Sequence, residues 1–79
     1  MQYQLPVSAE PLDNYRIRVE FKNGEHRVFD VTPYLQDNFW SSLKVPEIFK
    51  LVRVGPLSLE WPNGVDICPE EVYFNSVPI

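Results

Sequence analysis

The sequence of 79 residues is poor in the side chains on which most enzymes rely, with one cysteine, one histidine and three glycines. A single cysteine excludes an intrachain disulfide and a cysteine-based zinc site. His26 is the only histidine, and nothing in the sequence supports pairing it with Cys68 as a nucleophile system. The three glycines lie in separate turns and cannot form a phosphate-binding loop. The sequence therefore indicates no catalytic residue, no cofactor and no metal site, and we expect a protein that is not an enzyme.

Long apolar runs are absent as well. No stretch approaches the ~18 apolar residues that a membrane-spanning helix needs. The first residues do not show the basic segment followed by an apolar segment that a signal peptide has. We therefore expect a cytoplasmic protein that does not insert into a membrane.

Basic residues are scarce, since 7 Lys and Arg stand against 11 Asp and Glu, for a net charge of −4. A protein that binds nucleic acid usually carries a basic stripe that displaces counterions from phosphates. The basic residues that cluster here are Arg16, Arg18, Lys22 and Arg27. Two acidic residues, Glu20 and Glu25, lie among them. Direct binding to nucleic acid is therefore not expected, and a partner of opposite, basic charge is favoured.

The residues that are present predict one domain over 1–79, because 44% of them are hydrophobic and can form a compact core. Residues 15–21 alternate between apolar and charged side chains, which is typical of a strand with one buried face. Lys22-Asn23-Gly24 provides a turn, and residues 25–31 return as a second strand. A hairpin over 15–31 is thus expected at the centre of the fold.

Two registers are open for this hairpin. A two-residue turn would place Ile17 opposite Asp30, whereas a three-residue turn with a glycine bulge would place Ile17 opposite Phe29 and Arg16 opposite Asp30. The second register is preferred, because it gathers apolar side chains on one face and opposite charges on the other.

The remaining segments predict an α+β fold, with a small, mostly antiparallel sheet of four to five strands and two or three short helices. Further strands are expected at 7–12, which forms an edge because of its prolines, at 51–54 and at 57–61. Helical turns are expected from Thr32, which would cap the first, at 46–49 and at about 69–75. In the last helix Glu70 and Glu71 complement the helix dipole, and Val72, Tyr73 and Val77 are expected to turn inward.

Several residues are candidates for binding. Phe39 and Trp40 lie in a loop, and Phe74 lies near the end of the last helix, so these aromatic side chains are expected to be partly exposed. Exposed aromatic residues beside polar ones commonly anchor protein interfaces. Asp66 follows a turn, where its carboxylate is expected to accept backbone N–H groups or, less often, to contact a ligand.

The segment from Trp61 to Tyr73, with Trp61-Pro62-Asn63-Gly64 followed by Asp66-Ile67 and Pro69-Glu70, resembles the closing motif of a small bacterial family known as domain of unknown function 2442. The hairpin residues match the same family, so the resemblance covers nearly the whole chain. It implies an α+β fold and no agreed active site. It also implies that some members are partners of a second small protein encoded beside them, as in a toxin–antitoxin module.

Two hypotheses about function follow. The first is a non-enzymatic interaction module that binds a small, basic protein, with an antitoxin-like role. The alternative is a small-ligand-binding or enzymatic domain with a pocket near Trp61, Asn63 and Asp66. A homodimer formed by strand pairing is a further option, although Pro6 and Pro11 would blunt the first edge strand.

Overall fold

A computed structural model describes residues 2–56 and 58–79 of the chain. In this part, seven strands form two antiparallel sheets, and two short α-helices and three 3-10 turns join them. The strands are β1 (Pro6–Pro11), β2 (Arg16–Phe21), β3 (His26–Asp30), β4 (Arg53–Val54), β5 (Leu59–Glu60), β6 (Asp66–Ile67) and β7 (Val77–Pro78). The helices are α1 (Pro46–Phe49) and α2 (Pro69–Asn75), and the 3-10 turns are Asp13–Tyr15, Thr32–Tyr34 and Ser41–Lys44. The α+β class is confirmed.

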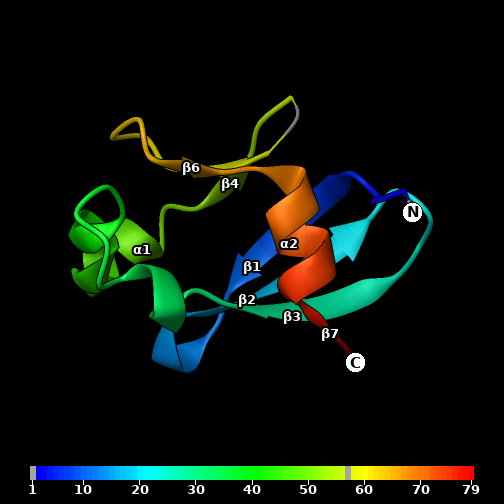
Figure 1. Cartoon of the computed structure of the whole chain (residues 1–79), viewed down its shortest axis with the longest axis horizontal. Coiled ribbons are helices and arrows are strands. Elements are labelled where there is room, and N and C mark those ends of the chain that lie inside the picture. The colour runs from blue at the N-terminus through cyan, green and yellow to red at the C-terminus, as the bar shows by residue number, and fades with distance from the viewer. Residues whose placement is uncertain (1, 57) are drawn as a thin grey trace.

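The strands are divided between two sheets, where the sequence predicted one sheet of four to five strands. One sheet has the order β1-β2-β3-β7 and the other the order β4-β5-β6. Strands β6 and β7 were not predicted, because two residues are too few to show an alternating pattern. Figure 1 shows the shorter sheet above the longer one, with α2 beside both and α1 at one end.

The central hairpin has the predicted register. Arg16 pairs with Asp30 and Ile17 pairs with Phe29. The turn closes through the N–H of Gly24, which donates to the carbonyl of Phe21 at 2.8 Å. Gly24 has a φ of 89°, a left-handed conformation that suits glycine. The bulged turn was therefore correctly deduced from the pairing of apolar and charged faces.

The same turn occurs a second time, between β5 and β6. Here the N–H of Gly64 donates to the carbonyl of Trp61 at 3.1 Å, and the N–H of Trp61 donates to the carbonyl of Val65 at 2.8 Å. Gly64 has a φ of 90°. Because Asn63-Gly64 repeats the Asn-Gly pair of the first hairpin, applying the same turn to it would have predicted β6.

The other predicted strands are present but shorter. The edge strand at 7–12 is β1, which pairs with β2 and has a proline at each end. The strand at 51–54 is reduced to β4, because the N–H groups of Leu51 and Val52 donate to carbonyls of α1 and continue its last turn. Within 57–61, β5 covers Leu59–Glu60, and Leu57 lies outside the described residues.

The helices at 46–49 and 69–75 are confirmed as α1 and α2. The predicted cap of the earlier turn is wrong, since the carboxylate of Asp30 accepts the N–H of Thr32 at 2.9 Å and Thr32 itself caps nothing. Val77 was also expected to turn inward, but it is 67% exposed, because the chain leaves α2 and pairs with β3 as a strand.

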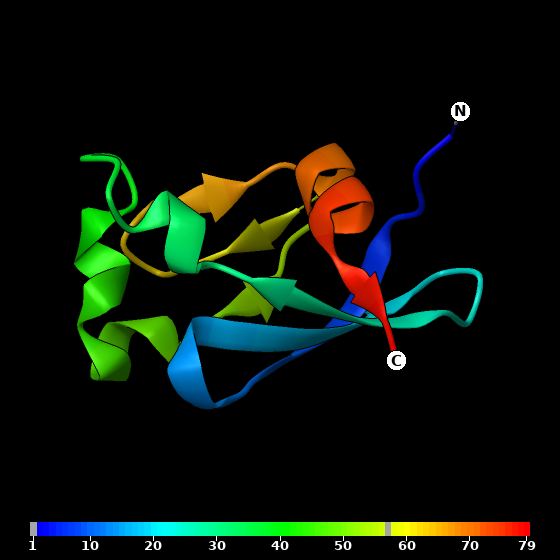
Figure 2. The ribbon, with the colours of Figure 1, turned by 60° about the horizontal axis from the view of Figure 1, so that its bottom comes forward.

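The core lies where the two sheets and α2 meet. Its side chains come from the inner faces of both sheets, from α2 and from the segment around α1, and the largest fully buried ones are Trp61, Phe21, Phe29, Ile17, Leu43, Leu59 and Ile67. Figure 2, turned from the first view, shows the 3-10 turn Ser41–Lys44 and α1 at the end of the sheets that lies farther from α2. This end carries the loop with Phe39 and Trp40.

Candidate functional site

Three aromatic rings form a connected group on the segment that follows β3. The ring centroids of Phe39 and Trp40 are 5.1 Å apart, and those of Trp40 and Tyr34 are 5.2 Å apart, both with edge-to-face geometry. We call Phe39, Trp40 and Tyr34 the aromatic row. Phe39 is 53% exposed, whereas Trp40 and Tyr34 are half-buried. The expected exposure of Phe39 and Trp40 is therefore found, most fully at Phe39.

Polar contacts hold this row in place. The N–H of Phe39 donates to the carboxylate of Asp37 at 2.9 Å, which fixes the local turn. The indole N–H of Trp40 donates to the main-chain carbonyl of Asp66 at 2.9 Å. Asp66 begins β6, an edge strand of the shorter sheet, so the indole satisfies a carbonyl at an otherwise open edge. The row is thus anchored to the sheet rather than carried on a free loop.

Asp66 itself takes a role other than the expected one. Within the described residues its carboxylate is exposed and accepts no backbone N–H group, and its contact with Trp40 is made by the main chain. The carboxylate remains available at the surface beside the aromatic row.

The residues expected to form a pocket with Asp66 have structural partners. Trp61 is 1% exposed, and its indole N–H donates to the carbonyl of Phe49 at 3.0 Å. Asn63 donates to the Ser42 hydroxyl at 2.9 Å and accepts the N–H of Val65 at 3.3 Å. Trp61 is therefore a core residue, and the Asn63 side chain stabilises its turn.

Pockets that the described residues line are found elsewhere. One, of about 350 Å³, lies where the end of β3 meets α2, and is lined by Asp30, Pro33, Tyr34 and Asn75. Another, of about 260 Å³, is lined by Leu12, Asp13, Asn14, Tyr15, Pro46, Phe49 and Lys50. The first shares Tyr34 with the aromatic row, so the pocket and the row adjoin at this residue. The sequence did not predict this pocket: the spacing of Asp30 and Thr32 indicates an aspartate turn, but the approach of Asn75 has no local signal.

Tyr34 connects the row to α2. Its hydroxyl donates to the carboxylate of Glu71 at 2.5 Å and accepts from the side-chain amide of Asn75 at 3.3 Å. Burial, together with the hydrogen bond to Glu71, raises the pKa of Tyr34 to about 12. The phenol is therefore a neutral donor throughout the physiological pH range.

Phe74 lies apart from this surface. It is 44% exposed on α2, and its ring stacks edge-on with Tyr73 at 5.5 Å. The structure thus brings Phe39, Trp40 and Asp66 together, places Asn63 in the neighbouring turn, buries Trp61 and leaves Phe74 on another element.

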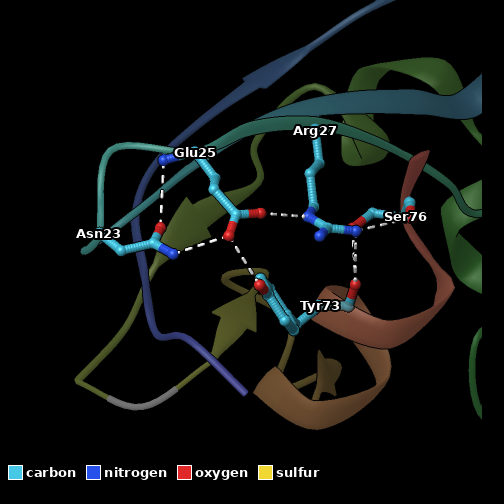
Figure 3. A network of polar contacts seen from close by, with 5 residues as sticks. All are labelled: Asn23, Glu25, Arg27, Tyr73 and Ser76. Atoms are coloured by element: carbon cyan, nitrogen blue, oxygen red, sulfur yellow. Dashed lines mark hydrogen bonds and ion pairs between the residues drawn. The ribbon is translucent and has the colours of Figure 1, made fainter. Parts of the chain in front are cut away.

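A polar network joins the hairpin to the end of α2 (Figure 3). Arg27 donates to Glu25 at 2.8 Å and to the carbonyls of Tyr73 and Ser76 at 3.5 and 3.3 Å. Its guanidinium also lies 4.3 Å from the centre of the Tyr73 ring. Hydrogen bonds from Tyr73, Asn23 and Arg27, in that order, lower the pKa of Glu25. Arg27 is thereby engaged inside the fold and is withdrawn from the basic cluster of the sequence.

Other potential reactive groups are isolated. Across residues 2–56 and 58–79, no three His, Cys, Asp or Glu side chains converge where they could hold a metal ion. Cys68 is exposed and directly precedes α2 as its N-cap residue. Neither α1 nor α2, the α-helices of the described part, has the length and apolar character needed to cross a membrane.

Comparison with known proteins gives one match. The family model described as "Protein of unknown function (DUF2442)" matches residues 6–78. The search of curated proteins and the search of solved structures each returned no match. The matched range contains both hairpins, the aromatic row and α2. Since the match extends over almost all of the sequence, the chain belongs to the DUF2442 family of proteins of unknown function.

Proposed function

We propose that this protein is a non-enzymatic, cytoplasmic interaction module that uses the aromatic row to bind a small, basic partner protein. In line with the resemblance of the sequence, the partner would be a small protein encoded beside it, with this chain in an antitoxin-like role. The main observation in support is that Phe39 is 53% exposed and yet held in place. Its N–H donates to the carboxylate of Asp37, and its ring packs against Trp40.

An aromatic ring that is exposed and already ordered is suited to binding. Such a side chain loses little conformational freedom on association, so more of the burial energy contributes to affinity. Aromatic residues are accordingly enriched among those that dominate binding at protein interfaces. The turn made by Asp37 and the packing on Trp40 supply that order here.

Charge supports a basic partner. The net charge is −4, and the exposed carboxylates of Asp37 and Asp66 lie beside the two rings at the tip of the row. Complementary charge around an apolar contact increases the rate of encounter more than the final affinity. Binding is therefore expected to slow with rising salt, while the apolar contact of Phe39 persists.

The test is capture of the partner with tagged full-length protein from the cytoplasm of its native host. We expect one small basic protein in stoichiometric amount. The Phe39→Ala variant should fold normally, because the side chain is mostly in water, and should bind the purified partner at least about 30-fold more weakly. Calorimetry on the purified pair measures this change.

Leu51→Ala is the matched control, since Leu51 is 55% exposed but lies after α1, outside the row. It should bind as the unmodified protein does. Equal affinity of the Phe39→Ala variant, or recovery of the domain alone, would contradict the proposal. Phe74→Ala tests in the same assay whether the interface extends to α2.

A further inference from the structure

We infer that the pocket beside Tyr34 receives an arginine side chain of the partner. This inference rests on the proposed function and specifies the chemistry of the partner's anchoring residue. The pocket is lined by Asp30, Pro33, Tyr34 and Asn75 and measures about 350 Å³, near the lower end of the range for small-molecule sites. Such a volume suits one long side chain.

The pocket exists because β7 is shorter than β3. Pairing between the two strands ends at Val77 and Val28, because the residues that precede Val77 form the end of α2. The carbonyl of His26 accepts the N–H of Ile79, so the main-chain groups of His26 face the β7 side of β3. This orientation repeats at every second residue of a strand, and the main-chain groups of Asp30 therefore face the same side. The last residue of β3 thus has no neighbouring strand on this side, and the space opens to solvent.

The charges at this pocket favour a cation. In the described part of the chain, ion pairs join Arg27 to Glu25 and Arg53 to Glu60, so the carboxylates of Asp30 and Glu71 are paired with no basic side chain. Arg16 is opposite Asp30 in the hairpin, but its Nε donates to the carbonyl of Asp13 at 3.3 Å. An anion would meet the negative charge of Asp30 here, and an apolar group would leave Asp30 desolvated.

The remaining groups favour guanidinium over ammonium. Tyr34 lines the pocket, and a planar, weakly hydrated guanidinium stacks on an aromatic ring better than a compact ammonium does. Asn75 donates its amide N–H to the Tyr34 hydroxyl, and this leaves its carbonyl oxygen as an acceptor. The Asp30 carboxylate has one oxygen engaged by the N–H of Thr32, and its second oxygen can accept a further hydrogen bond.

The pocket and the row therefore form a two-part surface. A partner segment with an apolar residue over Phe39 and an arginine at Tyr34 would satisfy both parts, since Trp40 bridges the two rings. Exposed acids flank each part, which matches the basic character proposed for the partner.

The experiment is an NMR titration of the isotopically labelled full chain with N-acetyl-arginine amide. We expect saturable shifts of the amide signals of Asp30, Tyr34 and Asn75. The Asp30→Asn variant keeps an oxygen for the Thr32 N–H but removes the charge, and it should bind the arginine compound about tenfold more weakly.

Asp37→Asn is the matched control. Asp37 is also an exposed aspartate that accepts the N–H two residues later at 2.9 Å, but it does not line the pocket. Its binding of the arginine compound should be unchanged. Absence of saturable shifts, equal weakening in both variants, or equal binding of the lysine analogue would each overturn the inference.

The two proposals fail separately. If Phe39→Ala loses the partner while Asp30→Asn leaves both partner affinity and arginine binding unchanged, the interaction surface stands and the arginine pocket is refuted. If the arginine compound binds as expected but no partner is captured, the proposed function falls while the cation-binding character of the pocket stands.

Discussion

At the residue scale, the two tryptophans make the same kind of hydrogen bond in different surroundings. Trp61 donates to Phe49 inside the core, whereas Trp40 donates to Asp66 at an exposed site. Water can replace the second bond but not the first. The Trp61 ring also fills core volume, being 1% exposed.

We therefore expect Trp61→Phe to lower the free energy of unfolding by about 2 kcal/mol, through a lost buried hydrogen bond and a cavity. Trp40→Phe should cost about 1 kcal/mol or less. Urea denaturation of the two variants provides the comparison. A larger loss for Trp40→Phe would mean that the row, rather than the core, holds the two sheets together.

At the element scale, two ion pairs allow a controlled test of how α2 is held. The Arg27 side chain is 18% exposed and contacts Glu25, the Tyr73 ring and the end of α2, while the Arg53 side chain is 59% exposed and contacts Glu60. Arg27→Met should reduce stability by about 2 kcal/mol, because several partly buried partners lose a charged donor.

Arg53→Met should change the free energy of unfolding by less than about 1 kcal/mol, as is usual for exposed ion pairs. Thermal or urea unfolding measures both variants. Similar effects of the two substitutions would show that the contacts of Arg27 contribute no more than an ordinary surface pair.

The same network predicts a dependence on pH. The pKa of Glu25 is lowered in the folded state, first by the hydrogen bond from Tyr73. Its carboxylate therefore stabilises the fold fully above the unfolded pKa, near 4.3, and this contribution disappears as the pH falls through the lower, folded value. The stability difference between the unmodified protein and Glu25→Gln should accordingly narrow below about pH 4. Urea titrations at several pH values measure it, and a difference independent of pH would contradict the assignment.

At the scale of the whole molecule, three of the four outer strands of the two sheets are protected, namely β1, β7 and β6. Prolines lie at both ends of β1, Pro78 occupies β7, and Trp40 covers a carbonyl of β6. Proline cannot donate to a neighbouring strand, so pairing between copies is disfavoured. We expect the isolated chain to sediment with the mass of one chain at micromolar concentration. A stable dimer under these conditions would favour the alternative of a homodimer formed by strand pairing.

Much of the fold could be predicted because its determinants are local. The alternation of residues 15–21 and the Asn23-Gly24 turn fix the central hairpin and its register, and Pro69 with two glutamates fixes the start of α2. The short strands β6 and β7 lack an alternating pattern, and only β6 has a local signal, the Asn63-Gly64 turn that precedes it. Each contains two residues, and it is a strand only because a neighbour pairs with it.

The features of the candidate site likewise divide into those that local sequence determines and those that tertiary packing determines. The sequence determined that this chain has an α+β fold around one hairpin, an acidic surface and exposed aromatic residues in the 39–40 loop. Tertiary structure decided that Trp61 is buried, that Trp40 bonds to the edge of β6, and that Tyr34 meets Asn75 to form a pocket. The reason is physical: turns and alternating strands depend on neighbours in the chain, whereas burial and pockets depend on which distant segments pack together.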